Sequence, residues 1–344
     1  MITDESEGKR MVRAIRMALG LVMLSLCLMM AILFLVLNPP GAPAPALSPL
    51  EPQQESLVWT APDSTAIPQT PEGDLIRYGR ELVAHTALYL GPQGSVAPVS
   101  NGMNCQNCHL QAGKKLWGNN YSAVAANYPK HRDRSGSIEQ IEHRVNDCLQ
   151  RSLNGAPLAW DSKEMQAFVS YIRWVGKDVP RNVTPDGAGV MELPFLNTAA
   201  DPSLGKVIYA ARCSRCHGSE GKGVKKESSE EWLYPPVWGP ESYNTAAGLF
   251  RLSRLAGYVK VNMPYGVRAD STELTVEEAW HVAAFINSQP RSVRHFSSDW
   301  PDIRTKPVDH PFGPYADSFT ESQHKYGPFG PILEARKRQP TSSR

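Results

Sequence analysis

Two copies of one five-residue pattern carry the residue types best suited to chemistry in this chain. The pattern is Cys-x-x-Cys-His, and it occurs as Cys105–His109 and again as Cys213–His217. This spacing is typical of c-type haem attachment, in which two thiols add across the haem vinyl groups and the adjacent histidine ligates the iron. A single copy also fits a redox dithiol that happens to precede a histidine, whereas two copies argue against that alternative. The sequence therefore predicts two covalently bound haem c groups. The residues predicted to hold them are Cys105, Cys108, His109, Cys213, Cys216 and His217.

The distal ligand of the second haem is predicted from a methionine in the second unit. Met263 is followed by Pro264, which favours a loop over packed core, and a loop before the closing helix is where small cytochromes c carry their distal ligand. A thioether is a soft, neutral ligand that raises the potential of the iron. Lys260 and His281 are weaker candidates, because His281 is expected on the exposed face of the closing helix. We therefore expect Met263 to ligate haem 2.

The first unit has a cysteine at the place that matches Met263. Cys148 precedes the closing helix of this unit by a similar interval. Met103 stands too close to the haem motif, Met165 lies on the apolar stripe of a helix, and Met191 lies beyond the unit. A bound thiolate would lower the potential of haem 1. The residues alone leave two interpretations of Cys148 open, namely a distal ligand or a buried free thiol.

Basic residues surround Cys148 in the sequence. Arg144 and Ser152 stand four residues before and after it, so all three can share one helical face. An arginine fork beside a thiolate-bound haem would suit a small oxyanion. The alternative is a solvated basic helix face. The arginines nearby are Arg132, Arg134, Arg144 and Arg151.

Helices are expected to position these residues in both units. Each unit reads as a helix, the haem motif, a long loop and a closing amphipathic helix, so the chain contains an internal repeat. The glycines that follow His217 suit a backbone that turns sharply around a haem edge. The expected helices are Leu75–Leu90, Ile138–Leu153, Ser162–Val175, Ser203–Arg212 and Glu273–Ser288.

The N-terminal segment predicts a membrane anchor. The apolar run Met17–Leu37 is long enough to cross a bilayer of about 30 Å as a helix. Four basic residues precede it, which by the positive-inside rule places the N-terminus in the cytoplasm and the rest of the chain outside. A cleaved signal peptide is the alternative. Cys27 is most simply a lipid-facing residue of this run.

Composition sets the remaining bounds on the chain. It has 344 residues and a net charge of +2, with scattered basic residues, so nothing indicates nucleic-acid binding. The sequence predicts a mainly α fold, with two tandem cytochrome c-type domains behind an N-terminal transmembrane helix. The expected boundaries are 1–40 for the cytoplasmic end and anchor, 41–72 for an extended proline-rich tether, 73–180 for the first domain, 181–200 for a linker, 201–290 for the second domain and 291–344 for an irregular tail without assigned chemistry.

These residues resemble a known family, the dihaem thiosulfate dehydrogenases that form tetrathionate. The likeness runs from about Tyr78 to Pro331, and its most specific part is the block around Cys148. The segments that carry it are Asn101–Leu110, Arg144–Gly155, Asp299–Asp302, Gly313–Asp317 and His324–Phe329. The second unit is similar to many cytochrome c domains.

The resemblance implies a role for each haem. Haem 1 would be the active site, with Cys148 as its distal ligand. The substrate-side residues there would be Arg134, Arg144 and Ser152. Haem 2, with Met263 as ligand, would be the electron exit. Some relatives carry a lysine where this chain has Asn262, so an exchange of ligands at haem 2 is not implied here.

The family also implies a reaction, partners and a location. Two thiosulfates would join through sulfur as tetrathionate and release two electrons, and the Cys148 sulfur could carry an adduct on the way. The electrons would pass to a periplasmic or membrane acceptor, such as a cytochrome c or a terminal oxidase. The chain would be a single-pass protein of the bacterial inner membrane with its soluble domains in the periplasm. Two alternatives are a tethered dihaem electron carrier without a substrate, and the same enzyme reducing tetrathionate.

Overall fold

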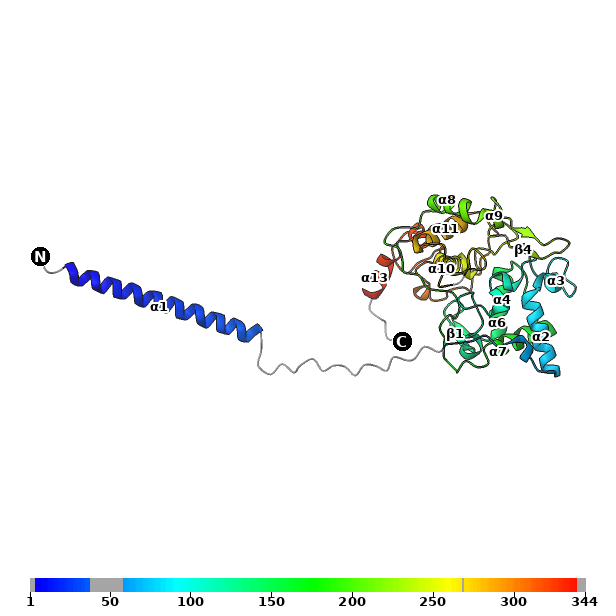
Figure 1. Cartoon of the computed structure of the whole chain (residues 1–344), viewed down its shortest axis with the longest axis horizontal. Helices are drawn as coiled ribbons and strands as arrows, with labels where there is room; N and C mark the ends of the chain where they lie inside the picture. Colours follow the sequence, from blue (N-terminus) through cyan, green and yellow to red (C-terminus); the bar gives the residue numbers. More distant parts are fainter. Residues whose placement is uncertain (1–3, 38–57, 268, 339–344) are drawn as a thin grey trace. The chain divides into compact units, whose positions relative to one another are not determined.

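The structure, a computed structural model, describes residues 4–37, 58–267 and 269–338. The chain divides into two units, Met1–Glu55 and Ser56–Arg344. In the first unit, α1 spans Asp4–Leu37 (Figure 1). Its segment Lys9–Leu37 is long and apolar enough to cross a membrane. Most of the predicted tether, residues 41–57, lies outside the described residues.

Two helices form the frame of the first half of the second unit. They are α2 (Pro71–Ala84) and α7 (Lys163–Val175), and their apolar faces pack against each other in one core. The closest approach is at Gly79, where a Cβ atom would lie 2.0 Å from the carbonyl oxygen of Ala167. Glycine is therefore required at this crossing. The side chain of Ser162 caps α7 by accepting from the Met165 amide at 3.2 Å.

The second half repeats this frame. Helices α8 (Pro202–Arg212) and α11 (Val276–Ser288) pack against each other. Their closest approach is again at a glycine, since a Cβ atom at Gly205 would lie 1.9 Å from the carbonyl oxygen of His281. The internal repeat predicted from the sequence is thus present in the packing of both helix pairs.

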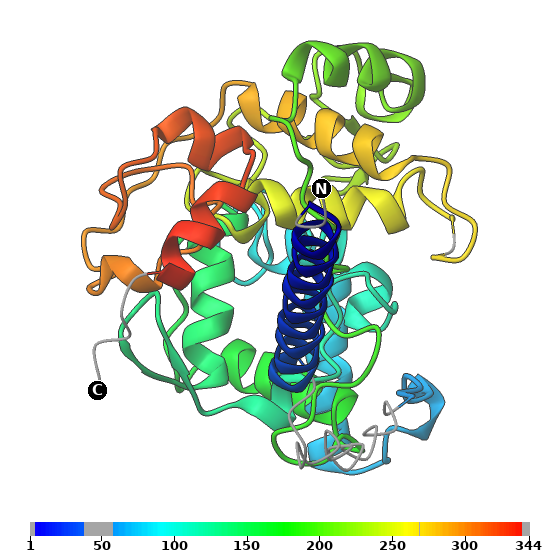
Figure 2. The ribbon, with the colours of Figure 1, turned by 90° about the vertical axis from the view of Figure 1, so that its left-hand side faces the viewer.

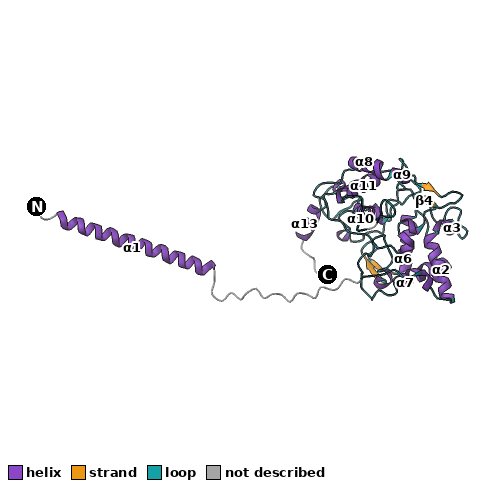
Figure 3. Ribbon diagram, in the orientation of Figure 1, coloured by secondary structure: helices purple, strands orange, loops and turns teal. Residues whose placement is uncertain are grey.

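The other elements of each half lie between its two framing helices in the sequence, and they carry the residues of interest. The described residues contain two short antiparallel hairpins, and everything else regular in them is helical (Figure 3). In the first half these elements are α3 (Thr86–Leu90), η2 (Cys105–Asn107), α4 (Leu110–Gly113), α5 (Val124–Asn127), β1 (Lys130–Arg132), β2 (Ser137–Glu139), α6 (Ile141–Asp147) and η3 (Cys148–Ser152). In the second half they are α9 (Ser214–His217), β3 (Val224–Lys225), β4 (Trp232–Tyr234), η4 (Gly248–Phe250) and α10 (Leu252–Asn262).

The two halves interlock through a hairpin. Trp232 of β4 is buried in the core of the first half, and Leu110 of α4 is buried in the core of the second. Beside Trp232, the buried Glu231 carboxylate accepts from Asn104 Nδ2 at 2.9 Å and lies 2.7 Å from His85 Nδ1. The hairpin of the second half therefore reaches Asn104, the residue that precedes the first haem motif.

The C-terminal tail covers both halves and is more regular than predicted. It contains η5 (Ile303–Thr305), α12 (Glu321–Tyr326) and α13 (Gly330–Arg338). Phe329 and Ile332 are fully buried in the core of the second half. The orange and red segments of the tail lie against the compact unit in Figure 2. The prediction of an irregular tail is wrong for these helices, because their few apolar residues gain burial only against another part of the fold.

Three local predictions also need correction. Residues 58–70 are packed rather than tether, since Trp59 and Ile67 are buried in the core of the first half and η1 spans Ser64–Ala66. The helix expected over Leu75–Leu90 breaks at His85 into α2 and α3. The helix expected over 138–153 begins later, since its first residues form β2.

Candidate functional site

The histidines of both motifs are held in one orientation by backbone carbonyls. His109 Nδ1 lies 2.5 Å from the Asn119 oxygen, and His217 Nδ1 lies 2.8 Å from the Pro235 oxygen. A proton on Nδ1 makes each bond, which leaves the lone pair of Nε2 available to a metal ion. Burial lowers the pKa of both rings, that of His109 to about 4. Both imidazoles are therefore suited to ligate iron from the proximal side.

The cysteines of the motifs are half-buried beside these histidines. Burial raises the pKa of Cys105 and Cys108 to about 12 and that of Cys213 to about 11. The first motif is held in place by a hydrogen bond from the Cys105 amide to Thr86 Oγ1 at 2.9 Å. All four are free thiols, as attachment to haem vinyl groups requires.

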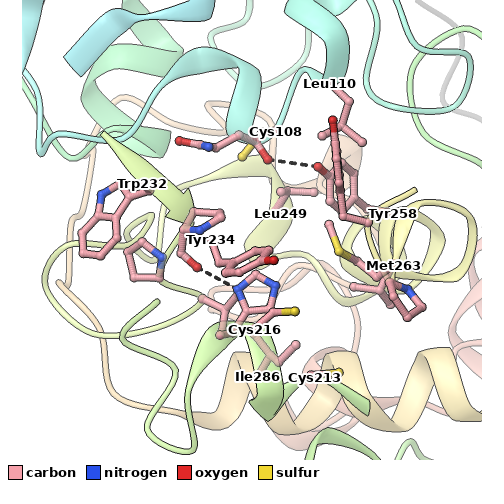
Figure 4. A pocket seen from close by; sticks show the side chains of 18 of the residues that line it. Cys108, Leu110, Cys213, Cys216, Trp232, Tyr234, Leu249, Tyr258, Met263 and Ile286 are labelled. Atoms are coloured by element: carbon pink, nitrogen blue, oxygen red, sulfur yellow. Dashed lines mark hydrogen bonds between the residues drawn. The ribbon is translucent and has the colours of Figure 1, made fainter. Parts of the chain in front are cut away.

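An apolar cavity lies at the second motif. Its volume is about 380 Å³, and Cys213, Cys216, His217 and Met263 all line it (Figure 4). The cavity also reaches Cys108 of the first motif. A flat, largely apolar group bound to two thiols and a histidine fits this lining. Its apolar walls include Tyr209, Leu249, Leu255, Val259, Val282 and Ile286.

The three candidates for the distal side of haem 2 differ in their surroundings. Met263 caps the C-terminus of α10 and lines the cavity. The Lys260 ammonium group donates to the Leu274 oxygen at 2.6 Å and to Thr272. His281 Nδ1 accepts from the Asp201 amide at 2.9 Å. Met263 is the candidate whose side chain meets the cavity.

Cys148 stands at the junction of α6 and η3, close to the first motif. Burial is the main cause of the raised pKa of both Cys105 and Cys108, and an electrostatic interaction with Cys148 is a further cause. The turn it begins is of the wide π type, in which the Leu153 amide donates to the Cys148 oxygen at 3.0 Å. Such turns are frequent at functional sites. Met165 is fully buried in the core, as predicted.

The arginines around Cys148 fall into two groups. An electrostatic interaction with Cys148 raises the pKa of Arg144, so the two side chains lie close together. Burial and the neighbouring Arg151 and Arg144 lower the pKa of Arg134 to about 10. Ser152 ends η3 and is half-buried. Arg144 and Arg134 thus form a cationic cluster near Cys148.

Arg151 belongs to the second group, because carboxylates hold it. Its Nε donates to Asp147 at 2.9 Å, and its two Nη atoms donate to Asp299 at 2.6 and 2.8 Å. Arg132 lies at 3.9 Å from the buried carboxylate of Glu139. The interpretation of this stretch as a solvated basic face is therefore wrong for Arg151, whose side chain is only 7% exposed.

The tail supplies residues to this site that the sequence did not assign. The amide of Trp300 donates to the Arg134 oxygen at 2.6 Å, and the Trp300 ring lies 5.7 Å from the Arg134 guanidinium carbon. Asp299 holds Arg151. The only signal in the sequence was the resemblance of this tail segment to other tails, since 148 positions separate Arg151 from Asp299.

The fold and the two motifs define a class of protein. The structure has two helix-framed units, each with an oriented histidine beside two half-buried thiols, and this arrangement is that of a dihaem c-type cytochrome. The first motif also has a further cysteine, Cys148, and Arg144 close to it.

Comparison with known proteins narrows this class of protein to a family. Residues 95–180 match the family model of the SoxA/TsdA cytochrome c domain, and residues 202–290 match that of cytochrome c. Thiosulfate dehydrogenase of Stutzerimonas stutzeri is 34% identical over 67% of this chain and 72% of its own length. That of Allochromatium vinosum is 34% identical over 69% of this chain and 85% of its own length.

A solved structure is similar as well. Thiosulfate dehydrogenase (TsdBA) from Marichromatium purpuratum matches with a TM-score of 0.61 and 31% identity over 67% of this chain. The match spans 49% of the length of that protein. The chain belongs to the thiosulfate dehydrogenase family. It is a thiosulfate-oxidising cytochrome c of this type, with two covalently bound haem c groups.

Proposed function

We propose that this chain oxidises two thiosulfates to one tetrathionate at the site of Cys148 and delivers the electrons through the second haem. The observation that carries the proposal is that Cys148 interacts electrostatically with both thiols of the first motif and with Arg144, and that Arg134 lies near Arg144. The two haems, when bound, supply one place each for the two electrons that the reaction releases. Every other step is assigned to side chains of the chain itself.

Arg134 and Arg144 bind the substrates in this proposal. Each thiosulfate carries two negative charges, so bringing two of them together is the main electrostatic obstacle. Guanidinium groups donate paired, charge-assisted hydrogen bonds to such oxyanions and offset the repulsion. Ser152, on the same turn as Cys148, adds a hydroxyl to this pocket.

Cys148 serves in two ways. Its sulfur would hold the iron of haem 1, and the same sulfur takes the first thiosulfate. Thiolate and thiosulfate join in a sulfur–sulfur bond and release two electrons, which leaves a Cys148 thiosulfonate adduct with one negative charge. The second thiosulfate then attacks the outer sulfur of that bond, which forms tetrathionate and restores the thiolate. Charge and atoms balance, and no proton is exchanged.

Met263 would hold haem 2, where a thioether raises the potential of the iron, and Cys148 would hold haem 1, where a thiolate lowers it. Electrons therefore run from the substrate site toward the exit. Asn262 is fully buried and donates to the Trp117 and Tyr258 oxygens at 3.0 Å each. An amide held in this way supports a fixed Met263 ligand rather than an exchange.

The N-terminal helix anchors the protein in the bacterial inner membrane. The segment Lys9–Leu37 is retained as a single span, with residues 1–40 as cytoplasmic end and anchor. The domains expected over 73–180 and 201–290 then work in the periplasm, near a cytochrome c or a terminal oxidase as acceptor. A signal sequence near the N-terminus can pass the same test of length and hydropathy. Detection of peptides from residues 1–37 in isolated membranes would show that the helix is retained.

Anaerobic mixing of the oxidised protein with thiosulfate tests this function. The haems of the parent protein are expected to become reduced, and those of Cys148→Ala are expected to stay oxidised while both remain attached. Full thiosulfate oxidation by Cys148→Ala would instead favour the tethered electron carrier. Haem oxidation by tetrathionate that outpaces reduction by thiosulfate would favour the reductase.

A further inference from the structure

One short segment of the tail, residues 296–300, lies against Arg134 and Arg151. Phe296 stacks on Arg151, with 3.9 Å between its ring centre and the guanidinium carbon. Asp299 receives both Nη groups of Arg151 in a fork. Trp300 covers Arg134 with its ring and holds the Arg134 backbone through its amide. Each of the two arginines therefore has a dedicated partner in the tail.

Asp147 is the residue for which these arginines compete. Arg151 Nε donates to Asp147 Oδ1 at 2.9 Å, while Arg134 Nη1 lies 4.0 Å from Asp147 Oδ2. A direct ion pair between Arg134 and Asp147 would need a shift of only about 1 Å, given ordinary charge-assisted distances. Such a pair would take Arg134 away from an anionic substrate. In the structure the two groups form only a long ion pair at 4.0 Å, without a direct hydrogen bond.

Trp300 is itself fixed in place. Its indole Nε1 donates to His310 Nε2 at 3.1 Å. Burial and the nearby Lys306 lower the pKa of His310 to about 4, so that nitrogen is free to accept. The backbone of Trp300 has a φ of 61°, a conformation that a bulky residue adopts only when its surroundings require it. Two independent restraints thus hold this ring over Arg134.

We propose that Asp299 and Trp300 are positioning residues of the thiosulfate site, which together keep Arg134 off Asp147 and available to substrate. Asp299 does so by locking Arg151 onto Asp147, and Trp300 by holding Arg134 directly. The inference rests on the proposed function, because it assigns Arg134 to the substrate. It gives the tail segment, which carries no residue of the haem motifs, a part in the reaction.

The test uses Trp300→Ala and Asp299→Asn in the full-length dihaem protein. Both variants are expected to raise the KM for thiosulfate about ten-fold, as loss of one charged hydrogen bond does, with a smaller change in kcat. The visible spectrum, haem content and midpoint potential of haem 1 are expected to stay those of the parent. The matched control is Trp160→Ala, which removes a 49% exposed ring that packs on His143 and is expected to leave KM unchanged.

A second substitution separates positioning from a loss of structure. Asp147→Asn keeps an acceptor for Arg151 but removes the charge that would capture Arg134, so it should restore most of the KM in the Trp300→Ala background. Calorimetric binding of thiosulfate to the fully reduced protein, which has no oxidising capacity left, should show the same ratios. Trp300→Phe, which keeps a ring over Arg134, should lie near the parent.

The outcomes are distinct. Parent-like KM and binding in both tail variants overturn the inference and leave the proposed function intact. A raised KM that Asp147→Asn does not relieve also overturns it, because the tail then acts through the fold alone. Binding of thiosulfate without haem reduction in the parent overturns the proposed function, while the binding ratios still decide the inference.

Discussion

Replacing Arg144 by alanine is the perturbation that bears most directly on substrate binding. Arg144 is half-buried on α6, and its electrostatic interaction with Cys148 raises its pKa, so the guanidinium is charged and close to Cys148. In the proposal it donates a charged hydrogen bond to thiosulfate. Loss of such a bond costs about 1.5–3 kcal/mol. At about 1.4 kcal/mol for each factor of ten, kcat/KM should fall about ten- to hundred-fold.

The assay is the initial rate of acceptor reduction with thiosulfate, measured over a range of substrate concentrations. Arg144→Lys keeps the charge without the planar fork, and should fall between the parent and the alanine variant. Arg173→Ala, which removes an exposed arginine of α7, is the matched control and should keep the parental rate. A parental kcat/KM for Arg144→Ala would refute the assignment of this residue to the substrate.

Three further predictions follow from other parts of the structure. Met263→Ala should lower the potential of one haem and remove the thioether charge-transfer band from the red end of the oxidised spectrum; unchanged potentials would point to another ligand. Gly205→Ala should destabilise the protein by about 1–3 kcal/mol through its clash with α11, whereas Gly248→Ala, with open space around its Cβ, should be neutral in the same thermal melts. Although burial opposes it, bonds from Lys226, His85 and Asn104 lower the pKa of Glu231. The ionised Glu231 carboxylate therefore stabilises the folded protein above pH 4.5, the ordinary pKa of a glutamate. This stabilisation is lost as the pH falls through the lower pKa that Glu231 has in the folded state. Below pH 4.5 the melting temperature of Glu231→Gln should accordingly fall less steeply than that of the parent, and parallel curves would contradict the assignment.

The parts of the fold that could be predicted from the sequence are those with a local cause. The haem motifs are contiguous, and the apolar periodicity of α7 and α11 is strong enough to predict a helix without tertiary context. Helix α10 was not predicted. It contains Gly257, a poor helix former, and its buried Asn262 interrupts the apolar stripe. Contacts with the rest of the fold decide its conformation.

The substrate site shows the same division. The position of Cys148 and the spacing of Arg144 and Ser152 were apparent in the sequence, because these residues share one short stretch. The ion pairs of Arg151 could not be predicted from the sequence, because one of its carboxylate partners, Asp299, comes from the tail. Trp300 likewise reaches Arg134 only through the folded path of the chain. Long-range charge pairing has no local signature.

The amount of tetrathionate formed per electron tests the central claim most directly. Oxidised dihaem protein is mixed with excess thiosulfate without oxygen or acceptor, and both haem reduction and tetrathionate are measured. The account predicts that both haems become reduced, with one tetrathionate for each pair of electrons, and that Cys148→Ala gives neither. Haem reduction without tetrathionate, or an unchanged yield in Cys148→Ala, would contradict it.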